Sequence, residues 1–272
     1  MKLKKLILMT MPAAMLAYFG PSTNQNYCSN IAKLATPKKE TATQGYSALN
    51  PQQIEQIKRI TIETIKNNPE LISSQIKKFQ DEKITKTQTR DQNLIKNNKY
   101  ALLMENNNLG YGNKKSAFTI VEFIDYQCSH CKKLASTLRK DFATKGNVRV
   151  IVKELPILGK NSVNAAKAAI AASKQGKYTK FQNYLLTSNQ AFTEENLMKA
   201  AKQIKLNMTR FKKDFASNKT AKHLDKNLTL AKKLIINATP TIVVTKTDGS
   251  KGKIIPGSLS SSEINKLLSS LR

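Results

Sequence analysis

The chain is poor in cysteine and aromatic residues and has no tryptophan, which narrows the classes of protein to which it can belong. Among its 272 residues there are 3 cysteines, and aromatic side chains make up 6%. Three cysteines are too few for a small disulfide-scaffolded fold, or for two zinc sites built mainly from cysteine. Hydrophobic residues make up 40%, so the chain is too apolar to be wholly disordered.

Acidic residues are also scarce: 18 Asp and Glu stand against 46 Lys and Arg, for a net charge of +28. Such an excess raises the alternative of a protein that binds polyanions or an anionic membrane. The lysines are scattered among Asn, Gln, Ile and Thr, and aromatic residues are not interleaved with them as a base-stacking surface would need. We therefore interpret the excess as a solvated cationic surface and expect no specific nucleic-acid partner.

The first 22 residues have the pattern of a signal peptide. Lysines in residues 1–5 precede an apolar run from Leu6 to Phe19, which is too short for a transmembrane helix. The small residues Gly20 and Ser22 predict cleavage after Ser22; an uncleaved, anchored start is the alternative. Export to the periplasm implies an oxidising compartment, so the cysteines are first considered as disulfide chemistry.

Residues 23–46 are polar and without periodicity, and we interpret them as a flexible leader. Cys28 lies in this leader, where it is either a bystander or pairs between two chains. Residues 47–106 form an N-terminal helical segment. Asn50 can cap its first helix, Pro51 suits the first helical position, and Gln53 can complete a capping box.

The apolar stripe of this segment is thin. It consists of isoleucines at roughly helical spacing, and Asn68-Pro69 then ends the first helix and starts another. These apolar residues are too few to form a core alone. They must therefore pack on the following domain or on another chain. We favour a homo-oligomer formed through residues 47–106. The turn-rich stretch from Glu105 to Asn113 marks the boundary with a main domain over 107–272.

The main domain begins with a Cys pair between a strand and a helix. Residues 118–124 are β-branched and aromatic, which predicts a buried strand of a mostly parallel sheet. Cys128-Ser129-His130-Cys131 follows, and apolar residues then recur at helical spacing. A helix N-terminus presents unpaired N–H groups and partial positive charge, which favour a thiolate at Cys128. His130, between the sulfurs, can add hydrogen bonding or charge, which would make the disulfide oxidising.

Other interpretations of the pair are weaker. Zinc would need a second pair of ligands, and the only other histidine is His223. Covalent haem attachment needs histidine directly after the second cysteine, where Lys132 stands. A purely structural disulfide remains an alternative, although so short a loop yields little entropic stabilisation. We expect neither metal nor cofactor.

The rest of the chain predicts an α/β domain with an all-helical insertion. Residues 148–155 form a second strand, and the helix after the Cys pair is the crossover between the two. A helical stretch covers about 157–236. Strands return at 241–244 and 253–255, and a last helix covers 260–271.

Residues from about 116 to 272 resemble the DsbA family of exported thiol–disulfide oxidoreductases. The resemblance is carried by four pieces of sequence: Val121-Glu122-Phe123, Cys128-Ser129-His130-Cys131, Leu155-Pro156-Ile157-Leu158-Gly159 and Ala238-Thr239-Pro240-Thr241. It implies a thioredoxin-like fold with a helical insertion. Helices ahead of the domain are similar to those that support oligomers in some members.

The resemblance also implies roles for individual residues. Cys128 would be the attacking sulfur and Cys131 the buried resolving one. Pro240 would follow a cis peptide bond, and the backbone of Thr239 would pair with an extended substrate. Glu122 would lie under the disulfide and assist proton transfer to Cys131, with Lys153 as its charge partner; an ordinary strand residue is the alternative.

The implied function is a protein dithiol–disulfide oxidoreductase. It would act on reduced or misoxidised exported proteins and be reoxidised by a membrane redox partner. Ser129 departs from the proline of many members, and threonine before the cis-proline also occurs in isomerases and reductases. A disulfide isomerase or reductase is therefore the first alternative, and a non-catalytic polyanion- or membrane-binding protein with a structural disulfide is the second.

Overall fold

The computed structural model describes residues 49–105 and 109–272. The chain divides into two compact units, with the boundary in the sequence between Pro69 and Glu70. The predicted signal peptide, the leader and Cys28 lie outside the described residues. Within those residues no helix is both long and apolar enough to cross a bilayer.

Helix α2 (Pro51–Asn67) begins as the sequence predicts. The Asn50 side chain accepts a hydrogen bond from the Gln53 N–H at 2.9 Å, and the Gln53 side chain accepts one from the Asn50 N–H at 3.0 Å. This reciprocal pair satisfies two N–H groups that the helix itself leaves without partners. No residue of α2 is buried.

Helix α3 (Pro69–Asn97) begins directly after Asn68, so the predicted break is confirmed. Its first five turns are exposed, including Phe79 at 67%. From Asp91 onward the helix is buried against the main domain, and it leads into a wide helical turn, η2 (Tyr100–Met104). The C-terminal end of α3 therefore packs on the main domain.

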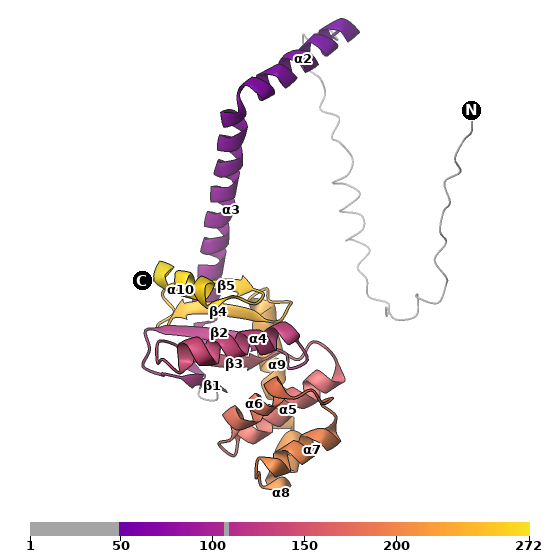
Figure 1. Ribbon diagram of the computed structural model, residues 1–272, viewed down its shortest axis with the longest axis vertical. Helices are drawn as coiled ribbons and strands as arrows, with labels where there is room; N and C mark the ends of the chain where they lie inside the picture. The colour runs from indigo at the N-terminus through magenta and orange to yellow at the C-terminus, as the bar shows by residue number, and fades with distance from the viewer. Residues whose placement is uncertain (1–48, 106–108) are drawn as a thin grey trace, which may run out of the picture. The chain divides into compact units, whose positions relative to one another are not determined.

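A five-stranded sheet forms the centre of the main domain, in the order β1-β3-β2-β4-β5 (Figure 1). The strands are β1 (Leu109–Gly112), β2 (Phe118–Ile124), β3 (Arg149–Glu154), β4 (Thr241–Lys246) and β5 (Gly252–Pro256).

The prediction of a mostly parallel sheet is wrong. Only β2 and β3 pair in parallel, and the other three pairs are antiparallel. The parallel pair is the one joined by a helical crossover, through α4 (Ser129–Thr137) and the wide turn η3 (Leu138–Ala143). Strand β1 was missed because its short sequence, Leu-Gly-Tyr-Gly, has the composition of a turn.

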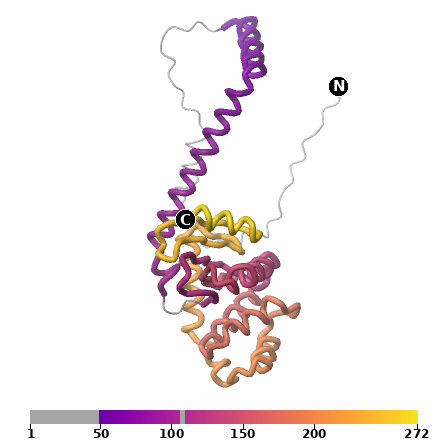
Figure 2. The backbone as a smooth tube through the Cα atoms, turned by 60° about the vertical axis from the view of Figure 1, so that its left-hand side comes forward, coloured from indigo at the N-terminus to yellow at the C-terminus, as the bar shows by residue number. Residues whose placement is uncertain are grey.

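The two faces of the sheet bury two separate cores. On one face Ile120, Ile124 and Val152 pack with α4, with the insertion helices and with α10 (Ser261–Ser270). On the other face Val121 and Phe123 pack with the end of α3, with η2 and with α9 (Asn218–Lys233). Figure 2 shows the end of α3 and the helices α4 and α10 on opposite sides of the sheet. Successive side chains along a strand point to opposite faces of the sheet. The even-numbered residues of β2 therefore face one core and its odd-numbered residues face the other.

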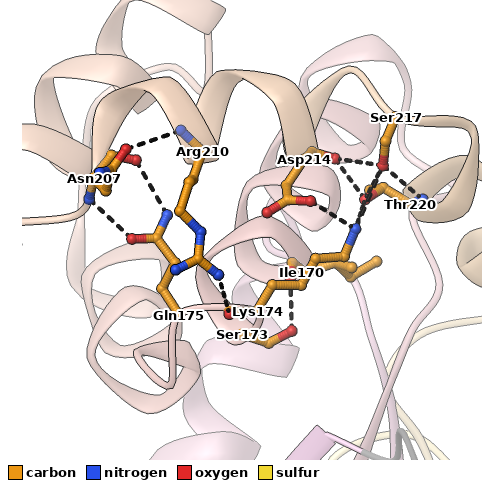
Figure 3. Close-up of polar contacts among 9 residues, drawn as sticks. All are labelled: Ile170, Ser173, Lys174, Gln175, Asn207, Arg210, Asp214, Ser217 and Thr220. Atoms are coloured by element: carbon orange, nitrogen blue, oxygen red, sulfur yellow. Dashed lines mark hydrogen bonds and ion pairs between the residues drawn. The ribbon is translucent and has the colours of Figure 1, made fainter.

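The helical insertion lies between β3 and β4. Its helices are α5 (Lys160–Ser173), α6 (Tyr178–Thr187), α7 (Glu194–Gln203), α8 (Met208–Phe215) and then α9. Lys174, at the end of α5, donates to Asp214 at 3.1 Å and to Ser217 and Thr220 at 3.4 Å, which ties α5 to α8 and α9 (Figure 3).

Side chains of α3 cover the outer edge of β5. Asp91 Oδ2 accepts the Ile254 N–H at 3.0 Å, and Gln92 Oε1 accepts the Gly252 N–H at 3.0 Å. A Cβ atom at Gly252 would lie 2.7 Å from Ile95 Cδ1, so only glycine allows this close approach. The edge strand therefore finds partners for its outward N–H groups in a helix, where a sixth strand would otherwise bind.

Replacing Asp91 tests how much this cover stabilises the domain. Asp91→Ala leaves the partly buried Ile254 N–H without its acceptor, which should cost about 1–3 kcal/mol of unfolding free energy in chemical denaturation. Asp81→Ala, at an exposed position of the same helix, is the control and should cost far less. Equal losses in the two variants would show that the contact does not stabilise the fold.

Candidate redox site

Cys128 lies where β2 gives way to α4, as the sequence predicts. It is the N-cap residue of α4, and its Sγ accepts a hydrogen bond from the Cys131 N–H at 3.3 Å. Its carbonyl oxygen accepts from the Lys132 N–H at 3.2 Å, which begins the helical ladder. The sulfur therefore occupies the position that a serine or aspartate oxygen usually takes, next to the partial positive charge of the helix.

Cys131 is the buried member of the pair. Its exposed fraction is 0%, against 9% for Cys128, and both residues are free thiols. Burial raises the pKa of the Cys131 thiol well above its ordinary value, and the hydrogen bond with Cys128 adds to that shift. A sulfur at Cys131 therefore holds its proton strongly when it is not in a disulfide.

The loop before β4 faces the pair. The Thr239-Pro240 bond is cis, which confirms that expectation, and the Cys128 thiol donates to the Thr239 carbonyl oxygen at 3.4 Å. Pro240 is buried and Thr239 is partly exposed. The Pro240 carbonyl oxygen accepts from the Gly257 N–H at 2.8 Å, which joins this loop to the end of β5.

The two residues between the cysteines are solvent-exposed. Ser129 and His130 are the first residues of α4, so both lie on the surface beside the more accessible sulfur. Their position fits the influence on the disulfide that the sequence predicts, and that influence stays a prediction.

Glu122 is fully buried in the middle of β2, on the sheet face that α4 covers. Burial, and after it the charge of Glu154, raises the pKa of the Glu122 carboxyl from 4.5 to about 8. The expected pairing with Lys153 is wrong: Glu122 stands beside Val152, and Lys153 stands beside Phe123 on the opposite face. There the Lys153 ammonium donates to the Ala101 carbonyl oxygen at 2.7 Å and lies 3.6 Å from Glu105.

A second buried carboxyl group, Glu154, ends strand β3. Its Oε1 accepts hydrogen bonds from the hydroxyl groups of Tyr126 and Tyr178, both at 2.8 Å. Burial raises the pKa of Glu154 to about 8, even though the two hydroxyl donors oppose that shift. The register places Glu154 beside Ile124, on the same face as Glu122.

An arginine and further polar side chains complete what we call the buried polar cluster. The Arg139 guanidinium lies 4.4 Å from the centre of the Tyr111 ring and donates to Gln182 Oε1 at 2.8 Å. Among the described residues, five buried polar atoms of the cluster have no hydrogen-bond partner. The cluster consists of Tyr111, Glu122, Tyr126, Arg139, Glu154, Tyr178 and Gln182. Native cores contain few such atoms, so their concentration here calls for a functional explanation.

Asp125 fixes the position of the loop that follows β3. Its carboxylate accepts the backbone N–H groups of Gln127, Ile157 and Leu158, at 2.8 to 2.9 Å. The Gln127 side chain also donates to the Leu158 carbonyl oxygen at 3.1 Å. Ile157 and Leu158 are thereby held exposed beside the residue that precedes Cys128.

Sequence reasoning missed Asp125, Glu154 and the aromatic and basic members of the polar cluster. The sequence does contain a signal for Glu154, because this carboxylate stands in an otherwise apolar strand. Once β2 and β3 are paired, the alternation of side chains places Glu154 on the same sheet face as Glu122. The sequence contains no such signal for Tyr178 and Gln182, because they come from an insertion helix whose packing the sequence does not specify. Among residues 49–105 and 109–272, no group of acidic, cysteine or histidine side chains could hold a metal ion.

A buried cysteine and a more accessible one at a sheet-to-helix turn, facing a cis-proline loop, define the redox site of the thioredoxin-fold class. The family model described as thioredoxin matches residues 104–269, which is more than half of the chain. The chain therefore belongs to the thioredoxin family.

The curated relatives are of two kinds. The chain is 28% identical over 146 residues to a probable disulfide bond formation protein D of Bacillus cereus, a match that covers 49% of this chain and 68% of that protein. It is also 25% identical over 135 residues to a Na(+)/H(+) antiporter NhaA 3 of Salinispora tropica. That match covers 49% of this chain but only 21% of the antiporter, so the chain matches a minor part of the larger protein.

Solved structures confirm the DsbA-like fold. A thioredoxin-like oxidoreductase from Silicibacter pomeroyi is 29% identical, with a TM-score of 0.58, over 63% of this chain and 95% of that chain. The thiol-disulfide exchange protein alpha-DsbA2 from Wolbachia pipientis, at 24% identity, has the same fold, with a TM-score of 0.60 over 67% and 96% of the two chains. The predicted thioredoxin-like fold with a helical insertion is therefore confirmed.

The raised pKa of Glu122 predicts a pH-dependent stability. Between about 4.5, the ordinary value, and about 8, the folded protein binds more protons than the unfolded chain, so the contribution of Glu122 to stability is lost as pH rises through this window. Chemical denaturation across the window should show Glu122→Gln becoming steadily more stable relative to the wild type. Glu70→Gln replaces an exposed glutamate and is the control. A constant difference between Glu122→Gln and the wild type would contradict the prediction.

Proposed function

We propose that the chain is an exported protein dithiol–disulfide oxidoreductase that forms disulfide bonds in secreted or envelope proteins. The observation that carries the proposal is the place of Cys128: its sulfur caps a helix N-terminus and contacts the cis-proline loop, while Cys131 is buried three residues later. Membership of the thioredoxin family and the similarity to a probable disulfide bond formation protein support this chemistry.

The reaction starts from the Cys128–Cys131 disulfide. A client thiolate attacks Cys128 Sγ, the sulfur–sulfur bond breaks, and Cys131 leaves as a thiolate. The client is then held in a mixed disulfide with Cys128. A second client thiolate attacks the client's own sulfur and releases Cys128, so the client loses two electrons and the Cys pair gains them. A membrane redox partner would reoxidise the pair.

Proton transfer accompanies the first step. Burial favours the neutral thiol at Cys131, so the leaving thiolate must gain a proton soon after it forms. Glu122 is assigned this role because its carboxyl group is buried on the same sheet face as α4 and stays protonated up to about pH 8.

The surface beside Cys128 suits an unfolded protein client. Ile157 and Leu158 are 42% and 51% exposed on the loop that Asp125 holds. Apolar side chains presented next to an attacking sulfur can bind apolar segments of a chain that has not yet folded. The backbone of Thr239, on the other side of the sulfur, is assigned to pair with the extended client.

A disulfide isomerase or reductase is the second candidate, and one observation favours it. The helices ahead of the domain expose large apolar side chains that a monomer would leave in water: Leu49, Ile54, Ile57, Ile60, Ile62, Ile65, Leu71, Ile72, Ile76, Phe79 and Ile84. We assign this apolar helical surface to a homo-oligomer. A non-catalytic polyanion-binding protein draws no support from the family match.

Substitution of the cysteines tests the proposed chemistry. Cys128→Ser should reduce the oxidation of a reduced peptide to the uncatalysed rate, because no sulfur remains to form the mixed disulfide. Cys131→Ser should accumulate that mixed disulfide, visible as a mass adduct on non-reducing gels. Cys28→Ser, outside the main domain, is the control and should retain full activity.

Full activity of Cys128→Ser would remove the proposal. The direction of electron flow is decided separately. A redox equilibrium with glutathione and an assay with a scrambled substrate distinguish an oxidase, which acts only on dithiols, from an isomerase, which repairs the scrambled protein.

Substitution of the apolar helical surface tests the oligomer. Ile60→Lys combined with Phe79→Lys places charge on two residues that are 62% and 67% exposed, and should reduce the mass in solution to that of a monomer. Ile235→Lys changes a residue of the main domain that is 65% exposed, and should leave the mass unchanged. A wild-type protein that is already monomeric by light scattering would exclude the homo-oligomer.

A further inference from the structure

Two buried carboxyl groups lie next to each other on the sheet face that carries the cysteine helix. Glu122 and Glu154 stand on the paired strands β2 and β3, two register positions apart and on the same face. Both have an exposed fraction of 0%. Two negative charges at such a separation in a water-free interior have a high free-energy cost. One of the two groups must therefore keep its proton near neutral pH.

Burial raises the pKa of both carboxyl groups to about 8, so the hydrogen bonds decide which of the two ionises first as pH rises. Glu154 Oε1 accepts from two tyrosine hydroxyl groups at 2.8 Å, whereas neither oxygen of Glu122 accepts a hydrogen bond from any described residue. Donors directed at a carboxylate stabilise its charged form. The geometry therefore points to Glu154 as the group that ionises first and to Glu122 as the group that keeps its proton longer.

The charges that face the pair agree with one shared proton. Arg139, from η3, is the cation whose charge acts on Glu122. The other titratable groups that interact electrostatically with Glu122 or Glu154 are Tyr111 from β1, Tyr126 after β2, Tyr178 from α6 and Asp125. The tyrosines are neutral and Asp125 is satisfied by three backbone N–H groups. One guanidinium therefore cannot balance two carboxylates, although its charge acts on Glu122 and there opposes the effect of Glu154.

We propose that Glu154 is a positioning residue of the thiol–disulfide reaction: its carboxylate keeps the neighbouring Glu122 protonated, so that Glu122 has a proton to give to Cys131. The inference rests on the proposed function and adds a second carboxyl group to it. Hydrogen bonds from Tyr126 and Tyr178 favour the ionised form of Glu154, and Tyr126 also links the pair to the turn that carries Cys128.

The proton balance closes over one cycle. When the client thiolate attacks Cys128, the electron pair of the broken bond stays on Cys131, and the Glu122 carboxylic acid gives that sulfur its proton. Glu122 then stays ionised beside ionised Glu154, an unfavourable arrangement that favours the return of that proton from Cys131 when the pair is reoxidised. On reoxidation the Cys131 thiol loses its proton to the Glu122 carboxylate as its sulfur re-forms the bond with Cys128.

The pH dependence of a single turnover tests the role of Glu154. The oxidised full chain is mixed with excess reduced glutathione, and each rate is divided by that of Glu122→Gln at the same pH, which cancels ionisation of the attacking thiol. The wild-type ratio should fall as pH rises through about 8, because Glu122 loses its proton there. Glu154→Gln removes the neighbouring charge and should move this midpoint lower by roughly one pH unit. Glu70→Gln, an exposed control, should leave it in place.

Infrared spectroscopy of the oxidised protein gives an independent readout that needs no Glu154 variant. As pH rises through about 8, the carboxylic-acid carbonyl band that survives the first ionisation should be present in the wild type and absent from Glu122→Gln. A band that survives in Glu122→Gln would place the proton on Glu154 and overturn the inference. The inference would also be overturned if a folded Glu154→Gln protein had the same midpoint of the pH-dependent rate ratio as the wild type. Neither result affects the proposed function, which instead fails if Cys128→Ser keeps its activity.

Discussion

The hydrogen bond from the Cys131 N–H to the Cys128 sulfur is the interaction on which the rest of the site depends. It requires the short turn between β2 and α4 to end at Cys128, directly before the first helical residue, so the sulfur caps the helix. The same turn brings Cys128 against the Thr239 carbonyl oxygen and leaves Cys131 inside the core. One sulfur is thus reachable and the other protected, an asymmetry that a thiol exchange with an ordered sequence of attacks needs.

Local signals in the sequence predicted much of this arrangement. Asn50 and Gln53 form the expected capping box, the Cys pair lies at the expected turn, and the Thr239-Pro240 bond is cis. The cis bond was expected from the Cys pair and the resemblance to the DsbA family, whereas the capping box and the turn are each determined within a few neighbouring residues and are specified by a short stretch of sequence. The order and direction of the strands are not: β1 has a turn-like sequence and joins the sheet only because β3 offers it an edge.

The electrostatics of the interior could be predicted only in part. The resemblance implied a buried carboxyl group at Glu122, but its expected partner Lys153 lies on the other face, because strand register decides which neighbours share a face. The actual neighbours come from four separate elements, including Tyr178 from the insertion and Arg139 from the crossover. The helical insertion thus does more than enlarge the domain: it supplies a hydroxyl donor to the buried carboxyl pair.

The cover that α3 places over β5 has a consequence for a protein whose proposed clients are unfolded. Unfolded chains bind readily to open sheet edges by adding a strand, and a catalyst that offered such an edge would become trapped in aggregates with its clients. Asp91 and Gln92 occupy the outward N–H groups of β5, so this edge is closed to strand addition. A client is thereby directed away from this edge of the sheet and toward the loops around the reactive sulfur.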